Sequence, residues 1–153
     1  MGEVIGLLIL VVLGVPSALS ECQCIHPNKE ETTHWGGNEM VVFAEKNPRK
    51  QLRGLVQMPN GQPVEGALVE VFTHPEYLRS DLPNATRDRS EQRRVAACRT
   101  GVRGRFCFRG LAKGTYELRS SIDSGWDVTH IHVMVDPQKG VSENLKVMMK
   151  LGT

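Results

Sequence analysis

The sequence predicts an all-β domain, a sandwich or barrel of seven or eight short strands. Apolar and polar residues alternate along several short segments, clusters of Gly, Pro and Asn separate these segments, and no stretch has a convincing helical period. The pattern is clearest in residues 95–122, where Phe106 and Phe108 share one face of a segment whose other face is polar. Alternation over short segments with turn residues between them is typical of sandwiches and barrels.

Glycine-containing turns connect the expected strands. Asn60-Gly61 is a strong turn signal and predicts a hairpin, and the turns at 100–104 and 110–114 divide residues 95–122 into three strands. Residues 74–94 are long, charged and poor in apolar side chains, so we expect a surface loop of the kind that often carries function. The expected strands cover residues 40–44, 51–58, 64–72, 95–99, 105–109, 116–122, 128–135 and 144–151.

The N-terminus is expected to be a signal peptide covering residues 1–20. Its apolar run is too short to span a bilayer comfortably, and Ala18-Leu19-Ser20 resembles a cleavage site. Residues 21–48 are read as a tail with a cysteine pair and an edge strand, and residues 49–153 as a single β-sandwich domain. We therefore expect a secreted or periplasmic protein with no stable membrane insertion after cleavage.

The chain has four cysteines, Cys22, Cys24, Cys98 and Cys107. In an oxidising compartment they can form two disulfides, with three possible connectivities. If Thr100 faces Arg105 across a tight turn, Cys98 faces Cys107 and a cross-strand bridge is reasonable. The alternative is that a tail cysteine reaches the domain, and the sequence leaves the pairing open. A metal site built on Cys22, Cys24 and His26 lacks a complete ligand set.

Arginines are concentrated between residues 87 and 109, although the net charge is only +2. One interpretation is a docking patch for an anionic glycan, a lipid head group or an acidic protein, and the simpler one is a solvated surface. Nucleic acid is not expected, because no aromatic residues are interleaved among these arginines. The candidate patch consists of Arg93, Arg94, Arg103 and Arg105.

Two parts of the sequence resemble carboxypeptidase regulatory-like domains. They are GLV at 54–56 with NGQPVEGALV at 60–69, and Thr100 with GRF at 104–106, GL at 110–111 and GTYEL at 114–118. The resemblance covers roughly residues 50–151 and implies a prealbumin-like (transthyretin-like) Greek-key sandwich. It also implies a non-catalytic module that stabilises a neighbouring domain, or binds a protein or carbohydrate partner.

Residues 125–132, GWDVTHIH, are similar to the histidine motif of intradiol ring-cleavage dioxygenases, which share a related sandwich. That resemblance implies a ferric ion held by Tyr77, Tyr116, His130 and His132. Alternation along a strand does place both histidines on one face, and phenolate and imidazole groups suit iron. Asp127-Val128 stands where that family has an Arg-Pro pair, so the arginine that steadies the substrate is absent.

Other catalytic patterns are missing: the sequence has no nucleophile elbow, no phosphate-binding glycine loop before a helix and no HExxH helix. The sequence therefore predicts a secreted, non-catalytic β-sandwich module that binds an exported protein or a glycan and needs no cofactor. The alternative is an intradiol-type iron(III) dioxygenase that cleaves catechol-like aromatics.

Overall fold

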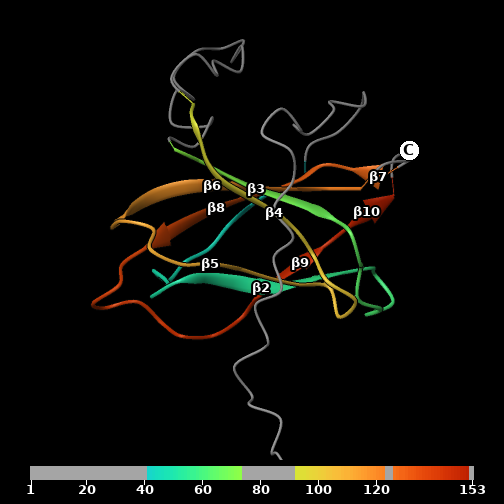
Figure 1. The fold of residues 1–153 in the computed structure, drawn as a ribbon, viewed down its shortest axis with the longest axis horizontal. Helices are drawn as coiled ribbons and strands as arrows, with labels where there is room; N and C mark the ends of the chain where they lie inside the picture. The colour runs from blue at the N-terminus through green and yellow to red at the C-terminus, as the bar shows by residue number, and fades with distance from the viewer. Residues whose placement is uncertain (1–40, 74–91, 123–125, 152–153) are drawn as a thin grey trace, which may run out of the picture.

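The structure is a computed structural model that describes residues 41–73, 92–122 and 126–151. Eight strands form two sheets that stack as layers (Figure 1), and a pair of two-residue strands lies at one end. The five-stranded sheet has the order β1 (Val41–Ala44), β8 (Thr129–Val135), β6 (Gly114–Ser121), β3 (Leu68–Thr73) and β4 (Arg94–Arg99). The three-stranded sheet has the order β5 (Arg105–Phe108), β2 (Leu52–Gln57) and β9 (Leu145–Met148), and the short pair is β7 (Trp126–Asp127) with β10 (Lys150–Leu151).

The predicted all-β fold is confirmed, and so is the alternation that predicted it. The core lies between the sheets and takes alternate residues of β2, β3, β4, β5, β6, β8 and β9, as a strand with one buried face requires. The rings of Phe106 and Phe108 both point into it, with centroids 6.0 Å apart and planes tilted by 46°. The other inward-facing residues include Leu52, Val56, Val69, Val71, Leu118, Ile131, Val133, Leu145 and Val147.

The predicted hairpins are wrong in their partners, although their turns are in the right places. Residues 56–64 do fold back around Asn60-Gly61, where Gly61 has a φ of +85° and the backbone NH of Gln62 bonds to the Asn60 side chain. After this turn the chain crosses to the other sheet: β2 belongs to the three-stranded sheet and β3 to the five-stranded one, so the two strands do not pair as a hairpin. The turns at 100–104 and 110–114 likewise carry the chain between the sheets.

Thr100 and Gly104 fix the crossing from β4 to β5. The Thr100 hydroxyl donates to the Val64 carbonyl at 2.6 Å and accepts from the Ala67 NH at 2.9 Å. Gly104 has a φ of +67°, and a Cβ there would lie 2.4 Å from the Val56 carbonyl oxygen. A side chain at this position would therefore be strained both by the backbone and by the neighbouring strand.

Thr100→Val is expected to lower the free energy of unfolding by roughly 2–3 kcal/mol, because valine keeps the shape but leaves one buried NH and one buried carbonyl without their partner. Urea denaturation would measure the loss. The exposed Thr115→Val serves as the control and should change stability by no more than about 0.5 kcal/mol. Equal midpoints for the two variants would contradict the structural role assigned to Thr100.

Asp136 fastens the turn that follows β8. Its Oδ1 accepts hydrogen bonds from the backbone NH groups of Gln138 (3.0 Å) and Lys139 (3.1 Å), and its Oδ2 lies 2.9 Å from the Lys113 ammonium. The hydrogen bond with Lys113, followed by those of the turn, holds the pKa of Asp136 below its usual 3.8. A carboxyl group whose pKa is lowered by folding stabilises the folded state above its usual pKa, and that stabilisation is lost as the pH falls.

Asp136→Asn should therefore be less stable than the wild type at neutral pH, with a difference that shrinks as the pH is lowered through 3.8. Urea midpoints measured from neutral pH down to about pH 2 would follow this convergence. Glu143→Gln, at an exposed side chain, is the matched control. A stability difference that does not change with pH would contradict the assigned role of the ionised carboxylate.

Candidate functional site

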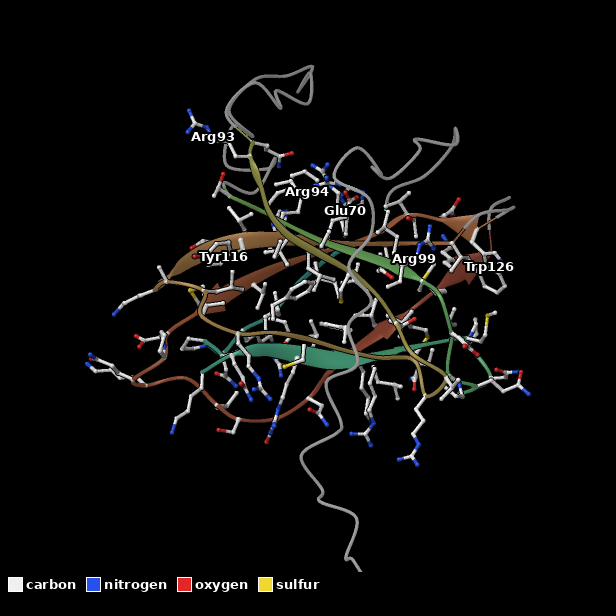
Figure 2. All side chains as sticks on the ribbon, viewed as in Figure 1. Glu70, Arg93, Arg94, Arg99, Tyr116 and Trp126 are labelled. Atoms are coloured by element: carbon white, nitrogen blue, oxygen red, sulfur yellow. The ribbon has the colours of Figure 1, made fainter. Side chains whose placement is uncertain are left out.

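Tyr116 belongs to the core. It lies on the inward face of β6, is 8% exposed, and donates its hydroxyl to the carbonyl oxygen of Ala112 at 2.9 Å. Its register partner on β8 is Val133, another core residue. Figure 2 shows Tyr116 at one end of the five-stranded sheet. The tyrosine therefore stabilises the turn that precedes β6.

His130 and His132 lie on the opposite face of the same sheet. They alternate along β8 with the core residues Ile131 and Val133, so their side chains point away from the core. His130 is nevertheless fully buried, and His132 is partly buried. The two histidines do share a face, as alternation predicts, but the sheet separates them from Tyr116.

The residues described in the structure do not fit the ferric site that the dioxygenase resemblance implies. Tyr116 and the histidines face opposite sides of one sheet, so a single ion cannot contact all three, and Tyr77 lies outside the described residues. The Nδ1 atom of His130 is 2.7 Å from Glu117 Oε1, which also accepts the Nε of Arg119 at 2.7 Å. A guanidinium this close would repel a metal ion. Within the described ranges, no group of three or more His, Cys, Asp or Glu residues is arranged to hold a metal.

Glu117 is the centre of a buried ionic cluster on this outward face. Its Oε1 accepts from His130 and Arg119, and its Oε2 accepts from the side-chain amide of Gln92 at 2.8 Å. Because an ionised carboxylate only accepts, the proton in the contact with His130 is on Nδ1. Gln92 also accepts from Arg119 through its own carbonyl oxygen, so it ties the start of β4 to β6. We define the ionic cluster as Glu70, Gln92, Arg94, Glu117, Arg119 and His130.

The second ion pair of the ionic cluster joins β3 to β4. Arg94 donates to Glu70 at 3.0 Å, and Figure 2 shows the two side chains next to each other on the outer side of the five-stranded sheet. The guanidinium of Arg119 also stacks on Phe72, 3.9 Å from the ring centroid. Glu70 and Glu117 are fully buried, and each has an arginine partner. Buried charges of this kind are tolerated only when they are paired, so the cluster ties four strands together through their side chains.

The sequence did not reveal the ionic cluster. Glu70, Glu117 and Arg119 occupy the polar positions of alternating strands, which normally face solvent. The one available signal was their coincidence: three neighbouring strands each place a charged or imidazole side chain on the same face. This signal requires the strand order β8-β6-β3, which local sequence does not supply.

The four arginines predicted as one patch are divided between two places. Arg93 and Arg94 stand at the start of β4, and Arg94 is paired with Glu70. Arg103 and Arg105 stand beyond the other end of that strand, in the turn and in the three-stranded sheet. A six-residue strand is about 20 Å long, so the two pairs do not form a continuous surface.

Cys98 and Cys107 do not form the cross-strand bridge that the sequence allows. Cys98 points into the core from β4, while Cys107 points away from it on β5, opposite Arg53. Among the described residues no disulfide is present. The predicted pairing assumed that β4 and β5 are neighbours, whereas they lie in different sheets. Cys22 and Cys24 lie outside the described residues, so a bridge to the tail stays a prediction.

The outer face of the three-stranded sheet is basic. Arg105 and Lys146 flank Leu55 in one cross-strand row, and Arg53 lies two residues along the central strand. None of the residues in β2, β5 and β9 is acidic. Figure 2 shows many nitrogen-tipped side chains on this side of the molecule. We define the basic face as Arg53, Leu55, Gln57, Arg103, Arg105, Lys146 and Met148.

The basic face carries apolar side chains at one end. Gln57 pairs with Met148, which is 49% exposed, and the turn beside the end of β2 holds Val102, which is 66% exposed. Arg103 follows Val102 in that turn and is exposed. Arg53 donates to the carbonyl oxygen of Ser142. Within the described part of the chain, no carboxylate pairs with the side chains of Arg53, Arg103 or Lys146.

Comparison with known proteins gives only weak structural similarity. No protein-family model matches the sequence, and no curated protein matches it. The fold is similar to the crystal structure of 3-chlorocatechol 1,2-dioxygenase from Rhodococcus opacus, with a TM-score of 0.38 and 13% identity over 74% of this chain. The match covers 64% of the length of that enzyme. At this level of similarity the neighbour carries no argument about the family or the activity of this protein. Within the described residues, no helix is long and apolar enough to cross a membrane.

Proposed function

We propose that the protein is a non-catalytic β-sandwich module that binds an anionic partner through the basic face. The observation that carries this proposal is the contrast between the two sheets. On the five-stranded sheet, Arg94 and Arg119 each form an ion pair with a buried glutamate of the same sheet. On the three-stranded sheet, the strands carry cations and no acidic residue. No carboxylate of the described residues pairs with Arg53, Arg103 or Lys146, and such cations produce the positive potential that attracts an anionic partner.

The catalytic alternative has less support. The fully buried His130 contacts Glu117, which also pairs with Arg119, and Tyr116 is hydrogen-bonded inside the core. A dioxygenase would need these groups around a single ion. Residues 74–91 lie outside the described residues, so a contribution of the long loop to binding stays a prediction. Deletion of residues 78–91, which keeps Gln92 of the ionic cluster, would test it.

A charge-reversal experiment tests the proposed function. Arg103→Glu/Lys146→Glu reverses two exposed charges of the basic face, and Lys46→Glu/Lys139→Glu reverses two exposed lysines elsewhere. Both variants change the net charge equally. We expect the basic-face variant to bind immobilised polyglutamate at least roughly tenfold more weakly than the control variant, since like charges then oppose each other at the contact.

Salt-gradient elution from the polyglutamate column is the measurement. The wild type should elute at the highest salt, the control variant slightly earlier, and the basic-face variant first, because screening weakens exposed charge interactions. Elution of the two variants at the same salt concentration would mean that net charge alone determines retention. The proposed function would then be wrong.

A further inference from the structure

We propose that the anionic partner of the basic face is a membrane surface rich in anionic phospholipid, on which the domain docks reversibly. This inference rests on the proposed function and adds the identity of the partner. Two observations select a membrane over an acidic protein: the size of the basic face, and the apolar side chains at its end.

The basic face is small for a protein interface. Three strands of four to six residues make a surface roughly 14 Å wide and 13–20 Å long, or about 200–300 Å² in projection. A stable protein complex buries about 800 Å² on each partner. A folded protein partner would therefore need much more surface than this sheet provides, whereas a membrane requires no minimum area and gains from each cation near its head groups.

The apolar residues lie where a membrane can accommodate them. Val102 is two-thirds exposed in the turn beside β2, and Met148 is half exposed at the same end of the sheet. Arg103 follows Val102 directly, and Lys146 precedes Met148 by two positions on the same face. An apolar tip surrounded by cations suits the boundary between head groups and acyl chains, where apolar contact and charge attraction add.

The expected affinity is modest. Each Lys or Arg near an anionic bilayer raises partitioning by about fivefold. Arg53, Arg103 and Lys146 together would then give roughly a hundredfold gain over a neutral bilayer. Binding of that strength is reversible and sensitive to salt, which differs from the insertion of a membrane-spanning helix.

Vesicle co-sedimentation tests the inference with the full chain after any signal cleavage. The probes are vesicles of phosphatidylcholine with about 30% phosphatidylglycerol, and vesicles of phosphatidylcholine alone, at about 50 and 300 mM salt. We expect binding to the anionic vesicles at low salt and little binding in the other conditions. Arg103→Glu/Lys146→Glu should bind the anionic vesicles at least about 25-fold more weakly than the wild type. Lys46→Glu/Lys139→Glu should bind them with an affinity close to that of the wild type.

Val102→Ser separates a membrane from a soluble polyanion. It should reduce vesicle binding by about two- to fivefold, since an exposed apolar side chain no longer enters the interface, and should leave retention on polyglutamate unchanged. Circular dichroism and thermal melting would verify that all variants are folded. Because Val102, Arg103 and Lys146 are exposed, each substitution is expected to be tolerated.

The outcomes separate this inference from the proposed function. If the wild type is retained on polyglutamate through Arg103 and Lys146 but does not sediment with anionic vesicles, the membrane inference is overturned and the proposed function stands. If it binds neither probe, both are wrong. If the wild type binds vesicles but the basic-face and control variants lose the same amount of vesicle binding, net charge explains the binding and the membrane inference fails.

Discussion

Replacing Glu117 by glutamine is expected to lower the free energy of unfolding by about 3–5 kcal/mol. Glutamine keeps the shape of the side chain and removes its charge. Arg119, whose side chain is 5% exposed and lies 2.7 Å from the Glu117 carboxylate, would then remain buried without that counter-charge. The contacts of Glu117 with His130 and Gln92 would also weaken. Since small domains are stable by only about 5–15 kcal/mol, the variant should lose a large part of its stability, which urea denaturation would measure.

Two further variants make the Glu117 prediction specific. Glu143→Gln removes an exposed carboxylate that contributes only its backbone carbonyl to the described contacts, so its effect should stay within about 0.5 kcal/mol. Adding Arg119→Met to Glu117→Gln should restore part of the stability, because the buried guanidinium that lost this counter-charge is then removed. If Glu117→Gln alone melted like the wild type, the ionic cluster would not be the structural tie that its geometry indicates.

The sequence predicted the local structure correctly, because strands and turns are encoded locally. The alternation around Phe106 and Phe108 marked an inward face, and Asn60-Gly61 marked a turn that the Asn60 side chain stabilises. The same signals could not tell a hairpin from a crossing between sheets. Both arrangements need a tight turn and two alternating strands, so the turn at 100–104 was assigned to the wrong one. The difference depends on distant contacts, such as the hydrogen bond from Thr100 to Val64.

The candidate sites were less predictable, because each depends on the strand order. Alternation along the strands assigned Tyr116, His130 and His132 to strand faces. Placing them in one metal site required the further assumption that these faces lie on the same side of the sheet. In the structure β6 and β8 are direct neighbours, and Tyr116 pairs with Val133 on the core side of the sheet. His130 and His132 pair with Arg119 and Glu117, so they lie on the other side. The basic face was only half predicted, through Arg103 and Arg105. Its other cations, Arg53 and Lys146, come from strands far apart in the sequence.

Gly54→Ala is expected to destabilise the protein by more than the roughly 1–3 kcal/mol usual for overpacking. A Cβ at this position would lie 2.2 Å from the carbonyl oxygen of Leu145 and 2.7 Å from the ring of Phe106. Gly54 is the register partner of both residues, one on each side of the central strand. Neither neighbour can retreat without separating β2 from β9 or moving Phe106 out of the core. The expected result is a loss of the cooperative transition in thermal melting, or a sharp fall in soluble yield.

Gly114→Ala is the matched control, since it makes the same substitution at a strand glycine of the other sheet. A Cβ at Gly114 would meet the ring of Tyr116 at 3.5–3.6 Å, which is ordinary contact. We expect this variant to melt within a few degrees of the wild type, so the two alanines should differ widely. Comparable melting curves for both would mean that the three-stranded sheet has room for a side chain at its centre. That result would contradict the close packing of β2 between β5 and β9, which also sets the spacing of the cations on the basic face.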